Sequence, residues 1–171
     1  MKTKYVLYLY TRTLKTILEK YRAKIEEHSA TMEAMGLTPV ASRVLIYLML
    51  SEQHQATFEQ MVDYFKVSKS AISNALKMLE SVKMIESRTV GGQRKRYFSV
   101  KIKNMFSEDH LSQKIKEFST ILDDIRKIRK TNDEFSDELE DVSDLYKMML
   151  FEIPMILERW KRTVELKKKK K

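Results

Sequence analysis

The chain has 171 residues, which fits one domain or one compact head with helical extensions. It contains no cysteine, which excludes disulfides, a thiolate nucleophile and cysteine metal sites and favours a reducing compartment, so we predict the cytoplasm. Its formal net charge of +9 predicts an anionic partner. The longest wholly apolar run is Val44 to Leu50, well short of the roughly 20 residues that cross a membrane, so we expect no membrane partner.

The positive charge is concentrated in the middle of the chain. Residues 66–103 contain ten Lys or Arg and two Glu, whereas residues 133–152 contain eight acids and one Lys. The middle is therefore expected to attract the anion that the acidic segment repels. The final run, Lys167 to Lys171, is interpreted as a solvated tail, with a nonspecific phosphate contact as the alternative.

With only three Gly and two Pro, the chain is expected to be mainly helical. Apolar residues spaced three and four apart predict a helix from Leu14 that ends at Gly36. Thr38-Pro39 then begins a short buried helix, which ends near Leu50. After the polar loop "SEQHQA", Thr57 and Gln60 have the spacing of a capping box and predict a helix to about Phe65.

The following helix, from Lys69 to about Val82 with Ser68 as its cap, has one small, polar and basic face. Its inward stripe is predicted to comprise Ile72, Ala75, Leu76 and Leu79, and its outward face Lys69, Ser70, Ser73, Asn74 and Lys77. Such a face can bind base edges and phosphates in the major groove of DNA. The alternative interpretation is an ordinary solvated face without a partner. Two helices joined by a tight turn predict a helix-turn-helix.

A β-hairpin is predicted next, with strands at residues 84–90 and 94–102 around Gly91-Gly92. In the second strand Phe98, Val100 and Ile102 are expected to share one face. The polar residues expected at its tip, for phosphates or the minor groove, are Gln93, Arg94, Lys95 and Arg96. The alternative is a hairpin whose cations bind no partner and only prevent aggregation at the edge of the sheet.

These motifs resemble the winged helix-turn-helix transcriptional regulators of the MarR superfamily, nearest its GbsR-like branch. The resemblance lies in "GLTPVASRVLIYLML", "VSKSAISNALKMLESVKMIE" and "GGQRKRYFSV", which are similar to the second helix, the recognition helix and the wing of that branch. The chain departs from the pattern at Ser42 and Ile46, where the branch usually has glycine. The resemblance implies a dimer formed through the terminal helices and a response to small quaternary ammonium effectors.

Apolar stripes continue along helices predicted from Ser107 to Thr131 and beyond Asn132, where Pro154 is expected to kink or divide the last helix. Long stripes on one small head predict pairing with a second copy, and a monomeric bundle is the alternative. Four aromatic residues on the helical seams could hold a cationic effector, although core packing is the alternative: Tyr21, Tyr146, Phe151 and Trp160.

No catalytic residues, cofactor or metal site are expected, because the three His are scattered and no glycine-rich phosphate loop is present. The sequence therefore predicts a mainly α fold with a small β-hairpin wing, arranged as an N-terminal dimerisation helix (1–36), a winged helix-turn-helix domain (37–106) and C-terminal dimerisation helices (107–171). The predicted function is a homodimeric, sequence-specific DNA-binding regulator, most simply a repressor on a palindromic operator. A protein-interaction module without specific DNA binding is the alternative.

Overall fold

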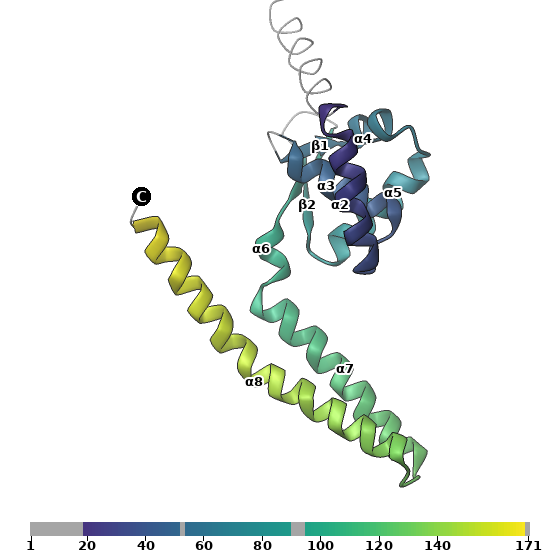
Figure 1. The fold of residues 1–171 in the computed structure, drawn as a ribbon, viewed down its shortest axis with the longest axis vertical. Coiled ribbons are helices and arrows are strands. Elements are labelled where there is room, and N and C mark those ends of the chain that lie inside the picture. Colours follow the sequence, from purple (N-terminus) through teal and green to yellow (C-terminus); the bar gives the residue numbers. More distant parts are fainter. Residues whose placement is uncertain (1–18, 52–53, 90–94, 170–171) are drawn as a thin grey trace, which may run out of the picture. The chain divides into compact units, whose positions relative to one another are not determined.

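The computed structural model describes residues 19–51, 54–89 and 95–169. The chain divides into two compact units, Met1–Asn104 and Met105–Lys171 (Figure 1). The described elements of the first unit are α2 (Arg22–Ala34), α3 (Pro39–Leu50), β1 (Gln55–Thr57), α4 (Phe58–Phe65), α5 (Lys69–Ser81), β2 (Ile85–Thr89) and β3 (Arg96–Val100). A short helix, α6 (Ile102–Met105), precedes α7 (Glu108–Arg129) and α8 (Glu134–Lys169) of the second unit. The predicted fold class, mainly helical with a small sheet, is confirmed.

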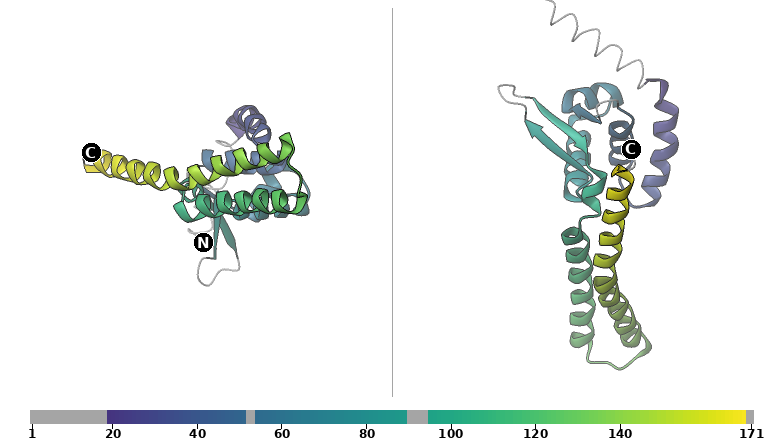
Figure 2. Two further views of the ribbon diagram at one scale, coloured as in Figure 1. Left: turned by 90° about the horizontal axis from the view of Figure 1, so that it is seen from below. Right: turned by 90° about the vertical axis from the view of Figure 1, so that its left-hand side faces the viewer.

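Helix α3 forms the centre of the first unit, and its apolar residues are buried almost all round. It packs against α2, α5 and the sheet. The residues buried in the same core include Ile25 of α2, Met61 of α4, Leu79 of α5 and Phe98 of β3. In Figure 2 the hairpin of β2 and β3 extends from the side of this unit opposite α2. Helix α2, which we predicted as a separate dimerisation helix, is thus also packed on α3.

The helix boundaries follow local signals in the sequence. Thr38 precedes α3 and its hydroxyl accepts a hydrogen bond from the Ala41 amide at 3.4 Å, with Pro39 as the first helical residue. Left-handed backbone conformations follow several helices: Gly36 (φ 97°) after α2, Lys66 (φ 55°) after α4, Lys83 (φ 60°) after α5 and Lys130 (φ 49°) after α7.

The sheet has three antiparallel strands in the order β1-β3-β2. Phe98 of the central strand lies opposite Ala56 on one side and Ser87 on the other, and it is buried in the core. Strand β1 lies in the segment that we expected to be a loop. Its three residues form a strand because they pair with β3, which is distant in the sequence. The prediction that the second hairpin strand extends to Ile102 is wrong: its partner β2 begins at Ile85, opposite Val100, so Ile102 has no strand to pair with and begins α6, 44% exposed.

The second unit is a helical hairpin in which α7 and α8 pack against each other. Its buried large apolar residues are few: Ile115, Leu122, Leu139 and Leu157. A polar contact joins the helices where the Ser143 hydroxyl donates to Asp123 Oδ1 at 2.7 Å. Pro154 does not divide α8, which continues through it to Lys169 and curves along its length (Figure 1).

None of the described helices is long and apolar enough to cross a membrane. The described residues also contain no cluster of three or more His, Asp or Glu with the placement of a metal site.

Candidate nucleic-acid interface

Helix α5 has an apolar side and a polar side. Its buried residues are the four that periodicity predicted: Ile72, Ala75, Leu76 and Leu79. Of the residues predicted for the outward face, Lys69, Ser70, Asn74 and Lys77 are exposed and Ser73 is partly buried. Four polar side chains, two of them lysines, are therefore available to a partner along α5.

Side-chain caps fix the start of each helix in the α4-α5 pair. The Thr57 hydroxyl accepts from the Gln60 amide at 3.3 Å, and the Gln60 side chain accepts from the Thr57 amide at 2.7 Å. At the start of α5 the Ser68 hydroxyl accepts from the Ala71 amide at 3.1 Å. Ser68 and Ser70 also share a hydroxyl–hydroxyl hydrogen bond of 2.9 Å. The first turn of α5 is thus held in one conformation, as a helix that enters a groove by its N-terminal residues requires.

Three exposed lysines near this surface are not neutralised within the described part of the chain. Lys69 and Lys77 of α5 and Lys95, which directly precedes β3, form no ion pair with any residue that the structure describes. Lys66, by contrast, donates to Asp63 Oδ1 at 2.7 Å. The unpaired ammonium groups leave a net positive potential on α5 and at the tip end of the hairpin.

The residues predicted at the hairpin tip divide into two groups. Gln93 and Arg94 lie outside the described residues, so their predicted contacts stay predictions. Lys95 is exposed, whereas Arg96 is bound within the protein. The Arg96 guanidinium donates to Glu80 Oε1 at 3.1 Å and to Ser87 Oγ at 2.5 Å, and it lies 5.2 Å from the centre of the Phe98 ring.

Sequence reasoning counted the two carboxylates of this region but did not predict their ion pairs. Glu86 of β2 lies 2.7 Å from Arg88 and 3.3 Å from Lys101, and Glu80 of α5 binds Arg96. These are the two acids of the basic segment 66–103. The signal that could have found them is their isolation among cations, because an acid in such a segment is favoured where it pairs with one.

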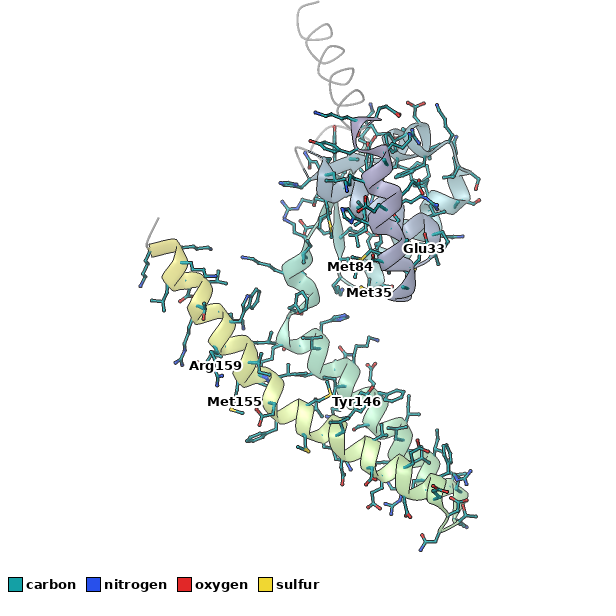
Figure 3. All side chains as sticks on the ribbon, in the orientation of Figure 1. Glu33, Met35, Met84, Tyr146, Met155 and Arg159 are labelled. Carbon is teal, nitrogen blue, oxygen red and sulfur yellow. The ribbon has the colours of Figure 1, made fainter. Side chains whose placement is uncertain are left out.

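The four aromatic residues predicted for an effector come from both units of the chain. Tyr21 belongs to the first unit and the other three to α8. The Tyr146 ring packs on Phe118 of α7 at a centroid distance of 4.9 Å, and its side chain lies on the side of α8 that faces α7 (Figure 3). Trp160 is 14 residues further along the helix, which corresponds to about 21 Å. The effector site stays a prediction.

Residues 35–96, which include the helix-turn-helix, β2 and the first residue of β3, match the family model described as the MarR family. No curated protein matches the chain. Among solved structures, the crystal structure of a transcriptional regulator is similar, with 22% identity, a TM-score of 0.72 and coverage of 85% of this chain and 98% of that one. This similarity shows a shared fold.

Two structures of MepR from Staphylococcus aureus, a transcription regulator of the multidrug efflux pump MepA, match with lower TM-scores. The first is 18% identical over 85% of this chain and 95% of that one, with a TM-score of 0.39. A MepR–DNA complex is 17% identical over 82% and 95%, also with a TM-score of 0.39.

Proposed function

We propose that the protein is a homodimeric transcriptional regulator that binds double-stranded DNA in a sequence-specific manner and acts as a repressor. The observation that carries the proposal is helix α5: it is capped by Ser68, anchored by four buried apolar residues, and presents Lys69, Ser70, Asn74 and Lys77 to solvent. The match of residues 35–96 to the MarR family and the fold shared with a transcriptional regulator support the same function.

Each part of the surface has a distinct task in this proposal. Asn74 has the amide groups that can bind adenine in the major groove, and Ser70 and Ser73 are small enough to let the helix approach the bases. Lys69 and Lys77 bind guanine or phosphate. The DNA backbone or the minor groove is bound by Lys95 together with the predicted tip residues Gln93 and Arg94.

A two-fold dimer would place two copies of α5 about one DNA turn apart, roughly 34 Å, and so requires a palindromic operator. The second unit supports such pairing, because its exposed apolar residues outnumber its buried ones. They include Ile128, Met148 and Phe151, at 78%, 65% and 73% exposure. In the proposal, residues 1–36 and 107–171 form the dimer and residues 37–106 bind DNA.

The test is fluorescence anisotropy with labelled fragments of the source genome, a shuffled-sequence competitor and a salt series. Binding that resists the competitor, with a protected palindrome, is the expected result. The logarithm of affinity should fall with the logarithm of salt concentration at a slope near −0.9 for each phosphate neutralised. Weak binding that the shuffled DNA displaces equally would overturn the proposal and leave a protein-interaction module as the better one.

Two substitutions separate base recognition from phosphate binding. Asn74→Ala is expected to relax the preference at one position of the operator, because it removes a base contact. Lys95→Ala is expected to weaken all sequences alike and to reduce the slope by about 0.9, because it removes a phosphate contact. Lys24→Ala is the matched control, since Lys24 lies on α2 and is paired with Glu27 at 2.7 Å. Equal effects of the first two changes on every sequence would contradict this division.

A further inference from the structure

Three side chains from three different elements meet where the hairpin packs against the end of α5. Glu80 lies in the last turn of α5, Ser87 in β2 and Arg96 at the start of β3. Glu80 Oε1 accepts from the Ser87 hydroxyl at 2.6 Å and from the Arg96 guanidinium at 3.1 Å, and Arg96 also donates to Ser87 at 2.5 Å. Every member of this group, which we call the Glu80 triad, therefore contacts the other two.

The register of the sheet explains why Arg96 points toward α5. Arg96 lies opposite Thr89, and Phe98 lies opposite Ser87, two residues away on each strand. Side chains two residues apart lie on the same face of a strand, so Arg96 shares the face of the buried Phe98. Its guanidinium is 5.2 Å from the centre of that ring, where it has a cation–π contact as well as its hydrogen bonds.

Glu80 has an unfavourable position unless it is paired. A carboxylate in the last turn of a helix faces the negative end of the helix dipole, and in the basic segment 66–103 it weakens the attraction for phosphate. Its side chain is 28% exposed, half the 56% of Arg96. The pairing with Ser87 and Arg96 offsets both costs and connects the end of α5 to both strands of the hairpin.

We propose that Arg96 is a positioning residue, which the Glu80 triad uses to hold the hairpin at a fixed angle to α5, and that it does not itself contact DNA. This inference rests on the proposed function. It assigns phosphate binding to Lys95 and the lysines of α5, whose ammonium groups have no ion pair among the described residues. Arg96 and Glu80 instead determine whether the hairpin reaches the duplex that α5 has entered.

The two roles of Arg96 predict opposite effects for Glu80→Ala. If Arg96 positions the hairpin, loss of Glu80 loosens it and weakens DNA binding by about three- to tenfold, in the range of coupling between contacting side chains. This happens although the change removes a negative charge from a DNA-binding surface. If Arg96 contacts phosphate, loss of Glu80 frees its guanidinium and removes a repulsion, so binding becomes tighter.

The experiment measures the affinity of the full-length chain for a 30-base-pair duplex selected from random DNA by the wild-type protein, at several salt concentrations. The variants are Glu80→Ala, Arg96→Gln, Arg96→Lys and the double variant Glu80→Ala/Arg96→Gln. Glu86→Ala is the matched control, because Glu86 is on the same hairpin and pairs with Arg88 and Lys101, which are both outside α5. Thermal unfolding of every variant provides a second double-mutant cycle that does not depend on DNA.

The proposal expects Glu80→Ala to bind DNA more weakly than the wild type and Arg96→Lys to bind no better than Arg96→Gln. The double variant should bind no more weakly than Arg96→Gln alone. Glu80→Ala, Arg96→Gln and the double variant should all have the same salt slope. The proposal would be overturned if Glu80→Ala bound DNA more tightly and if only Arg96→Gln reduced the slope of log affinity against log salt, by about 0.9. Strictly additive losses of thermal stability would also overturn it. If the wild-type protein selects no duplex, the proposed function fails, and the thermal cycle alone decides whether the triad couples α5 to the hairpin.

Discussion

The hydroxyl of Ser42 is fully buried in α3 and has no hydrogen-bond partner among the described residues. A buried polar atom without a partner costs about 1 to 3 kcal/mol, so Ser42→Ala is expected to raise the free energy of unfolding by about 1 kcal/mol. Chemical denaturation measures the change.

Ser29→Ala is the matched control, because Ser29 is equally buried but its hydroxyl donates to the Ile25 carbonyl at 2.5 Å. It is expected to be neutral or destabilising. A loss of stability in Ser42→Ala equal to that of the control would show that the Ser42 hydroxyl is satisfied.

Tyr47 gives the stability of the first unit a dependence on alkaline pH. Burial, with a smaller contribution from Tyr64, raises the pKa of Tyr47 from 10.0 to about 12. The folded protein therefore keeps the neutral phenol while the unfolded chain ionises, and stability is lost as pH rises between these two values, by about 1.4 kcal/mol per pH unit.

Tyr47→Phe cannot ionise and is expected to flatten this part of the pH–stability curve, while changing little at pH 8. Some dependence should remain, because burial also raises the pKa of Tyr64, whose ring lies 4.7 Å from that of Tyr47. Urea unfolding at pH 8 and at pH 11 tests the prediction, and an unchanged slope in the variant would contradict it.

The end of α2 depends on the backbone of Gly36, whose φ is 97°. A Cβ at this position would have no heavy atom within 4 Å, so Gly36→Ala causes no side-chain clash. The expected loss of about 1 to 2 kcal/mol comes from the left-handed conformation alone. Gly36→Asn should lose less, because asparagine tolerates that conformation, and equal losses in thermal unfolding would point to another cause.

The elements that the sequence predicted well are those with local signals. The buried stripe of α5, the Thr57-Gln60 box and the Ser68 cap depend on residues within four positions of each other. Strand β1 was missed because its partners are residues 97–99, 40 or more positions away. Ile102 was placed in a strand by alternation, although pairing had already ended at Val100.

Arg96 shows a different reason for a missed contact. Its positive charge and its place near the predicted tip suggested a nucleic-acid contact. The same alternation that put Phe98 inside also puts Arg96 on the inner face, so the signal was present. What the sequence did not provide was the register that brings Ser87 and Glu80 to the guanidinium.

The proposed dimer predicts that one exposed face of α8 lies in its interface. Met148, Phe151 and Met155 are exposed and follow each other at spacings of three and four, which puts them on one side of the helix. Met155 points away from the side where Tyr146 meets α7 (Figure 3). Met148→Glu/Phe151→Glu is therefore expected to raise the dimer dissociation constant by at least about tenfold, because charge is excluded from the core of an interface.

Sedimentation velocity over a concentration series measures this dissociation constant. Glu152→Gln is the control, since Glu152 is an exposed neighbour on the same helix. Unchanged assembly in the double variant, or a wild-type protein that stays monomeric at high concentration, would contradict pairing through this face of α8.

Two lysines with a left-handed backbone conformation, one on either side of α5, bear on attempts to make the protein more heat-resistant. Lys66 and Lys83 occupy backbone conformations that glycine adopts without strain, so glycine at either position should relieve local strain. It would also remove a positive charge beside α5, and the rate at which a charged protein meets DNA depends on such charges. If the protein has the function proposed above, selection for thermal tolerance alone would therefore favour variants that survive heating but find their operator more slowly.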